Sequence, residues 1–225
     1  MNDKIFIDEQ LVYNSQKFID WKSSVESNGV IINNINLLSV ITRDRKNLYS
    51  AFLDCNLTFP EGQTASRCIL IKGGGVVIIP VLKCIDDNET YTLLVKQRRI
   101  VDGDYSYEFP AGMIDDECQS PFKAAIKEAK EELGFDISSD ELTLLNSKPV
   151  KICTAILDEK VFFYSLNKKV SREFLNEIEN KSTGIKCEEE HINVKVKKMS
   201  ELYEIYNSNI LIGISLLIKN GIFKL

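Results

Sequence analysis

Short apolar runs separated by turn residues predict strands in the middle of the chain. The runs "VVIIPVL" (76–82) and "YTLLVKQ" (91–97) are rich in β-branched or apolar residues, and an Asp-Asp-Asn cluster lies between them. Such a cluster is typical of a turn, so the two runs are predicted to form a hairpin. Two further strands are predicted at 160–166 ("KVFFYSL") and 192–198 ("INVKVKK"), and apolar helical patterns follow from residue 200.

The residues before the triple glycine at 73–75 show a different pattern. The segment "GVIINNINLLSVIT" (29–42) has apolar residues at positions that fit a strand at least as well as a helix. Three successive glycines indicate a flexible joint or a close backbone approach. We therefore predict a β-rich extension over residues 1–66, which could serve in dimerisation, and a second domain over residues 67–225.

The segment from 120 to 134 predicts a helix with both ends specified. Ser120 suits the N-cap, Pro121 the first helical position, and Gly134 the position just past the last turn. At about 100° per residue, one sector of this helix is apolar and a second is basic. The apolar sector holds Phe122, Ala125, Ile126, Ala129 and Leu133, and the basic sector holds Lys123, Lys127 and Lys130.

The third sector of this helix carries three carboxylates, Glu128, Glu131 and Glu132. An amphipathic surface helix with a wet acidic side is one interpretation. However, like charges three and four residues apart destabilise a helix, so acids gathered in one sector favour a bound cation. Mg²⁺ or Mn²⁺ prefers such oxygen ligands and leaves waters for a phosphorylated substrate to displace. Lys127 is placed to pair with Glu131 one turn later.

Composition limits the class of protein. The 225 residues are 44% hydrophobic and 27% charged, with a formal net charge of −5. These values fit a globular protein with no membrane association and no duplex nucleic acid as partner. The predicted strands, which are interleaved with about three helices, favour an α/β (α+β) sandwich of layers. The start "MNDKIFIDEQ" lacks the basic then apolar pattern of a secretory signal, and the six cysteines form no C-x-x-C pair. We therefore expect a cytoplasmic location.

The stretch "YEFPAGMIDDECQSPFKAAIKEAKEELGF" (107–135) resembles the Nudix hydrolases. The second half of their box, R-E-U-x-E-E-x-G-U with U apolar, matches "KEAKEELGF" (127–135) except that Lys127 replaces the opening Arg. The first half of the box has one residue more here than the pattern allows. Gln119 then occupies the position of the first Glu of the box, and the nearby Glu117 could take its place. The lead-in "QRRIVDGDYSYEFPAG" and the later "LDEKVFFY" resemble the ADP-ribose and nucleotide-sugar pyrophosphatase branch.

This resemblance implies an α-β-α sandwich with a mixed sheet, and it implies roles for single residues. Glu128 and Glu132 would be the main metal ligands, with the Ala111 carbonyl as a further ligand and Glu131 as a ligand or its orienting neighbour. Arg99 and Glu108 would contact the diphosphate or the terminal sugar. Glu159 would be the base that activates water, with Asp158 the alternative.

Two tyrosines just before the box, Tyr105 and Tyr107, are candidates for contact with a base or ribose. The Nudix resemblance implies a Mg²⁺-dependent homodimer that hydrolyses the diphosphate of a nucleotide sugar, with ADP-ribose favoured. Products would be a nucleoside monophosphate and a sugar phosphate. Hydrolysis of UDP-sugars, dinucleoside polyphosphates or capped RNA is an alternative, as is a catalytically impaired nucleotide-sugar sensor.

Overall fold

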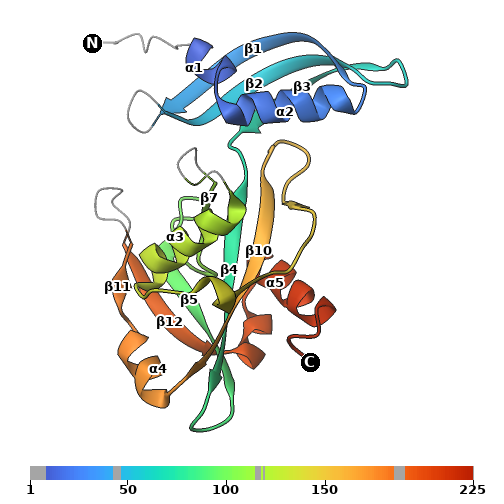
Figure 1. The fold of residues 1–225 in the computed structure, drawn as a ribbon. Coiled ribbons are helices and arrows are strands. Elements are labelled where there is room, and N and C mark those ends of the chain that lie inside the picture. Colours follow the sequence, from blue (N-terminus) through green and yellow to red (C-terminus); the bar gives the residue numbers. More distant parts are fainter. Residues whose placement is uncertain (1–8, 43–46, 115–117, 119, 185–190, 225) are drawn as a thin grey trace, which may run out of the picture. The chain divides into compact units, whose positions relative to one another are not determined.

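The computed structural model describes residues 9–42, 47–114, 118, 120–184 and 191–224. Contacts divide the chain into two compact units, coloured along the sequence in Figure 1. The first unit comprises residues 1–74 and 150–161, and the second comprises residues 75–149 and 162–225. None of the helices in the described segments is both long and apolar enough to cross a membrane.

The first unit is an antiparallel sheet of order β1-β2-β3 with two helices on one face. Its elements are α1 (Glu9–Tyr13), α2 (Gln16–Ser27), β1 (Ile31–Thr42), β2 (Leu48–Thr58) and β3 (Thr64–Ile71). Phe18 and Trp21 of α2 pack with Leu53 and Cys55 of β2 in a core of their own. The β-rich character of the predicted extension is confirmed, whereas its predicted end at residue 66 falls inside β3, and α1 and α2 were not predicted.

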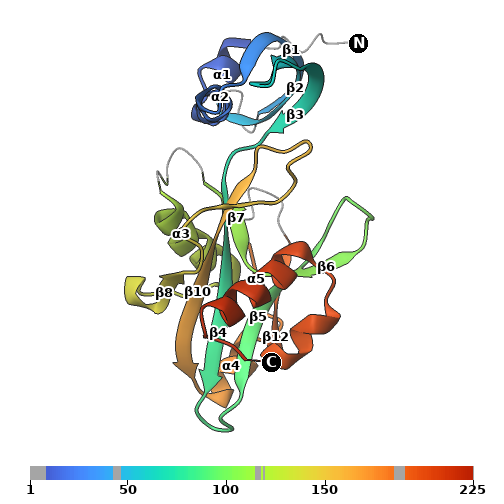
Figure 2. The ribbon, with the colours of Figure 1, turned by 90° about the vertical axis from the view of Figure 1, so that its right-hand side faces the viewer.

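A mixed sheet forms the centre of the second unit, and its strands follow the order β11-β12-β5-β4-β10-β8. The pair β4 and β5 is the predicted hairpin, and β12 matches its predicted range. In Figure 2 the arrows of β4 and β10 point the same way, whereas β5 runs antiparallel to β4. The strands are β4 (Gly75–Cys84), β5 (Thr90–Arg98), β6 (Tyr105–Glu108), β7 (Ala111–Met113), β8 (Leu142–Leu144), β10 (Lys160–Val170), β11 (Ser182–Thr183) and β12 (Ile192–Lys198).

Helices cover both faces of this sheet. On one face α3 (Pro121–Leu133) and α4 (Arg172–Ile178) share a core with residues such as Leu93 of β5 and Val194 of β12. On the other face α5 (Ser208–Lys219) packs Gly213 against Ile79 of β4 and Phe109. The described part of this unit also contains two short 3₁₀ helices, η1 (Ser139–Glu141) and η3 (Met199–Glu204). The predicted α-β-α sandwich is confirmed.

Helix α3 begins and ends where its sequence predicts. The Ser120 hydroxyl accepts a hydrogen bond from the Lys123 N–H, Pro121 opens the helix, and Gly134 adopts the left-handed conformation with φ 71°. The predicted apolar face was partly wrong. Phe122 is 37% exposed, whereas Ala124 and Glu132 are buried. The buried face extends toward the glutamates because β7 packs along that side.

Candidate active site

Strand β7 and helix α3 bring together Ala111, Gly112, Glu128 and Glu132. The Ala111 N–H donates a hydrogen bond of 2.9 Å to Oε2 of Glu132. Glu132 is only 6% exposed. The Glu128 carboxylate lies directly against Gly112, since a Cβ built on that glycine would be 1.9 Å from both Cδ and Oε1 of Glu128. Glycine at 112 therefore makes room for the Glu128 carboxylate, while the N–H of Ala111 orients the Glu132 carboxylate.

These groups are oxygen donors of the kind that hard divalent cations bind. Two carboxylates and a backbone carbonyl suit Mg²⁺ or Mn²⁺, which commonly retain waters and take only one or two carboxylates from the protein. Within the described segments, no three side chains of His, Cys, Asp or Glu are grouped closely enough to hold a metal ion. The donor set fits a metal whose remaining positions are filled by water and substrate.

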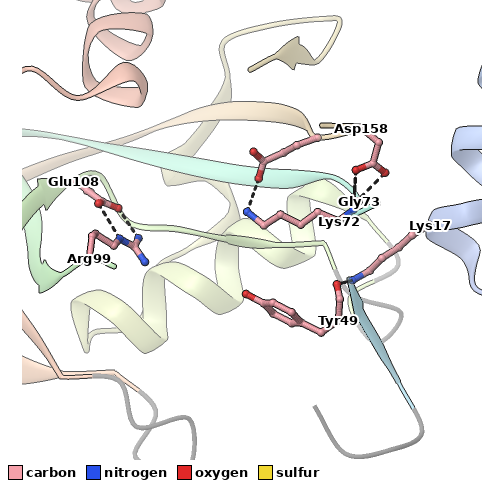
Figure 3. A network of polar contacts seen from close by, with 8 residues as sticks. Lys17, Tyr49, Lys72, Gly73, Arg99, Glu108 and Asp158 are labelled. Carbon is pink, nitrogen blue, oxygen red and sulfur yellow. Dashed lines mark hydrogen bonds and ion pairs between the residues drawn. The ribbon is translucent and has the colours of Figure 1, made fainter. Parts of the chain in front are cut away.

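Arg99 and Glu108 form a two-pronged ion pair at the end of β5 and β6 (Figure 3). Arg99 Nε donates to Oε1 of Glu108 at 2.9 Å, and Nη2 donates to Oε2 at 2.5 Å. Glu108 lies opposite Val95 in the register of β5 and β6. Val95 lies two residues from Leu93, so alternation along β5 places Glu108 on the α3 face of the sheet.

The charge state of Glu108 depends on this pairing. Burial alone would raise the pKa of the Glu108 carboxyl, but the hydrogen bonds and charge of Arg99, with a hydrogen bond from Ser106, hold that pKa below its ordinary value. A guanidinium that contacts both oxygens fixes the plane of the carboxylate as well as its charge. The pair is thus ionised and oriented at neutral pH.

Tyr107 lies on the other face of the same ribbon. Side chains alternate along β6, so Tyr107 points away from the face that carries Glu108. It lies opposite Lys96, whose Nζ is 5.8 Å from the Tyr107 ring centroid and 4.3 Å from that of Tyr105. Of the predicted substrate residues, the structure therefore joins Arg99 with Glu108 and separates Tyr107 from both.

Glu159 and Asp158 belong to the first unit and differ in their surroundings. The Asp158 carboxylate accepts hydrogen bonds from the backbone N–H groups of Lys72 (2.7 Å) and Gly73 (3.1 Å), as Figure 3 shows. Burial raises the pKa of Asp158, these backbone hydrogen bonds lower it, and the net change is upward. Glu159 instead accepts from the Lys72 ammonium, with Oε1 at 2.9 Å from Nζ. The Asp158 carboxylate therefore anchors its loop to the backbone at Lys72 and Gly73, whereas the Glu159 carboxylate is held by the Lys72 side chain.

A known family matches most of the second unit. The sequence profile of the family described as the NUDIX domain matches residues 77–206, which are more than half of the chain. The chain belongs to the Nudix family.

Relatives of this Nudix chain include proteins from a plant and a mammal. Nudix hydrolase 14, chloroplastic, of Arabidopsis thaliana is 27% identical over 149 residues, which are 63% of this chain and 48% of that protein. ADP-sugar pyrophosphatase of Mus musculus is 47% identical over 60 residues, 27% of each chain. The matched part thus spans about half of the first relative and about a quarter of the second.

A solved structure shares the Nudix fold. It is described as a crystal structure of ADP compounds hydrolase, with a TM-score of 0.57, 18% identity, and coverage of 86% of this chain and 97% of that one. At this identity the similarity shows the fold alone.

The second half of the Nudix box lies on α3. Lys127 and Glu131 are both half-buried there, and the ion pair between them stays a prediction. The Glu131 backbone carbonyl accepts a hydrogen bond from the Gly184 N–H at 3.3 Å. Gln119 and Glu117, the candidates for the first glutamate of the box, lie outside the described residues.

Two residues of these networks were not predicted as functional, namely Gly112 and Lys72. Gly112 is the first position of the Nudix box, so the resemblance itself contained the signal. Lys72 is far from the box in sequence and 87 residues from Glu159. No spacing rule links positions so distant, and only the folded chain shows their contact.

Proposed function

We propose that the chain is a Mg²⁺-dependent pyrophosphatase that hydrolyses the diphosphate linkage of a nucleoside diphosphate sugar, with ADP-ribose the favoured substrate. The products would be a nucleoside monophosphate and a sugar phosphate. The observation that carries this proposal is the arrangement of Ala111, Gly112, Glu128 and Glu132, in which a strand and a helix offer hard oxygen donors side by side.

The residues of the second unit would bind the metal ion. Glu128, Glu132 and the Ala111 carbonyl are the proposed ligands, with Glu131 a further ligand or an orienting neighbour, and Mn²⁺ could replace Mg²⁺. A bound divalent cation would neutralise charge on the diphosphate and lower the pKa of a coordinated water. The hydrogen bond from the Ala111 N–H orients the Glu132 carboxylate.

The proposed base is Glu159 rather than Asp158. Asp158 already accepts two backbone hydrogen bonds, which its loop needs to stay attached, so proton transfer to it would weaken that attachment. Glu159 makes a single side-chain ion pair and would take the proton of the attacking water. Lys127, at the box position of the family arginine, would orient the glutamates as a point charge.

Two observations support the proposed substrate class, namely the relatives of this chain and the ionised pair Arg99–Glu108. The relatives include an ADP-sugar pyrophosphatase, and a similar fold is that of an ADP compounds hydrolase. An oriented guanidinium–carboxylate pair offers a donor for phosphate oxygens and an acceptor for sugar hydroxyls. UDP-sugars, dinucleoside polyphosphates and a non-catalytic sensor role remain the alternatives that a substrate panel must separate.

The test is a panel of ADP-ribose, UDP-glucose, a dinucleoside polyphosphate and capped RNA with Mg²⁺, in which product nucleotides are resolved by chromatography. We expect AMP from ADP-ribose to form fastest. Glu132→Gln should lower turnover by orders of magnitude while the melting temperature stays close to that of the parent, because the amide oxygen can still accept from Ala111. No turnover of any diphosphate by the parent protein would reject the enzyme and favour a sensor.

Two further features belong to the proposal. The chain is proposed to form a homodimer through residues 1–66, and light scattering of the purified protein at several concentrations measures the mass directly. A cytoplasmic location is proposed as well, and imaging of a tagged full-length protein tests it. A monomeric mass at all concentrations, or a signal confined to another compartment, would contradict these parts without affecting the chemistry.

A further inference from the structure

Within the first unit, backbone contacts fasten the loop that carries Glu159 to β3. The Leu70 N–H donates to the Ile156 carbonyl at 2.7 Å, and the Asp158 N–H donates to the Leu70 carbonyl at 3.3 Å. Leu70 and Leu157 form a parallel bridge. Residues 156–158 therefore lie along the end of β3, although about 85 residues separate the two segments.

A second set of contacts fixes the loop at the start of the glycine segment. The Asp158 carboxylate accepts from the N–H groups of Lys72 and Gly73, and Gly73 has φ 90°, a conformation that favours glycine. A Cβ at Gly73 would approach Cγ of Lys17 to 3.0 Å. Lys17 is itself held, because its ammonium donates to the carbonyls of Leu48 and Tyr49 at 3.2 Å each. Figure 3 shows the contact with Tyr49.

Lys72 joins this anchored backbone to the Glu159 carboxylate. The distance from Nζ to Oε1 is 2.9 Å, and the two side chains are 33% and 17% exposed. Ordering long side chains ordinarily costs much of what an exposed ion pair gains. Here the backbone on both sides of the contact is already fixed, so the ion pair mainly determines the direction in which the Glu159 carboxylate points.

We infer that Lys72 is a positioning residue for Glu159. The inference rests on the proposed function, in which Glu159 takes the proton of the attacking water. Within the first unit, Lys72 holds the carboxylate that the proposed function assigns as the base, and Asp158 anchors the backbone beside it.

A double-mutant cycle tests this role. Lys72→Met removes the charge and retains the length of the side chain, and Glu159→Gln removes the base. With ADP-ribose and Mg²⁺, we expect Lys72→Met to lower kcat about ten- to a hundred-fold with KM within about twofold, since small displacements of a catalytic group have effects of this size. In the Glu159→Gln background the same change should have no further effect. Single-turnover measurements with enzyme in excess keep the slow variants measurable.

Controls separate positioning from folding and from direct binding. Lys72→Arg retains the charge and should restore most of kcat. Lys22→Met, which removes an exposed lysine paired with Glu26 at 3.8 Å in the same unit, should leave kcat unchanged. Melting temperatures show which variants fold, and Lys72→Gln replaces Lys72→Met in the cycle if the latter does not.

Four results would overturn the inference. These are an unchanged kcat in Lys72→Met, a raised KM with unchanged kcat, losses that multiply in the double variant, and full turnover in Glu159→Gln. In each case turnover by the parent protein leaves the proposed pyrophosphatase standing. A parent without turnover would instead reject the proposed function itself, so the two failures are distinguishable.

Discussion

Replacement of Gly112 by alanine is a direct test of the proposed metal site. The new Cβ would be 1.9 Å from Cδ and Oε1 of Glu128, whereas ordinary contact begins near 3.4 Å. The carboxylate must therefore move by at least about 1.5 Å. Its side chain is flexible, and Gly112 does not require the left-handed region, so the strand can accept alanine. The displacement thus falls on the proposed ligand and not on the fold.

We expect Gly112→Ala to retain a melting temperature within a few degrees of the parent and to lose about a hundredfold or more in turnover, since a 1 Å misplacement at a reacting centre already costs about that much. The concentration of Mg²⁺ needed for half-maximal rate should rise. The assay is AMP release from ADP-ribose over a Mg²⁺ titration, with thermal denaturation of the same samples.

Gly213→Ala is the matched control for loss of a glycine. Its Cβ would be 2.8 Å from Ile79 Cδ1 and 2.9 Å from Phe109 Cε2, on the face of the sheet opposite α3. Overpacking there costs about 1–3 kcal/mol, offset by about 1 kcal/mol of helix propensity. Its turnover per folded molecule should match the parent. A folded Gly112→Ala protein with parental turnover and Mg²⁺ dependence would refute the placement of Glu128 at a metal site.

Three other predictions concern the helix cap, the ion pair and the metal. Ser120→Ala removes the acceptor of the Lys123 N–H and should lower the free energy of unfolding by about 1 kcal/mol. Calorimetry should then show a fall of about 2–4 °C in Tm, and an unchanged Tm would contradict the capping role. Because the folded pKa of Glu108 is below its usual 4.5, the stability from its pairing with Arg99 is present above that value and is lost as pH falls through the lowered pKa. Arg99→Gln should therefore flatten the acid side of the stability curve, measured by urea denaturation from pH 3 to 7; parallel curves for parent and variant would reject this. Chelation with EDTA should abolish turnover and leave far-ultraviolet circular dichroism unchanged, since a hydrogen bond from the protein backbone at Ala111 also holds Glu132; loss of helix signal would show that the fold depends on the ion.

Much of the fold could be predicted because its signals are local. Ser120, Pro121 and Gly134 specify the ends of α3 through their own backbone preferences, and the structure retains all three roles. The hairpin β4–β5 follows from two apolar runs and one turn. Helix α2 was missed, although Ser15 caps it by accepting from the Phe18 N–H. Its polar composition has weak periodicity, and its few buried residues are defined by contact with β2.

Part of the candidate site could be predicted as well. The resemblance to the box selected Glu128, Glu132 and Ala111, and the structure places all three at the contact of β7 with α3. The apolar periodicity of α3 did not predict that Glu132 would be buried, because its burial depends on the strand that donates a hydrogen bond to it. Likewise, the sequence alone did not establish which face of the sheet carries Glu108 until the register of β6 with β5 was known.

The sequence by itself determined the helix of glutamates, the strands that flank it, the β-rich extension and the family, since caps, periodicity and a contiguous motif are all encoded within about thirty residues. Only the tertiary structure decided which carboxylates are oriented, and by what. Glu132 is held by Ala111, Glu108 by Arg99, and Glu159 by Lys72. The reason is physical, because a carboxylate is oriented by the donors that surround it. For Glu159 that donor is 87 residues away along the chain, and folding alone brings the two together.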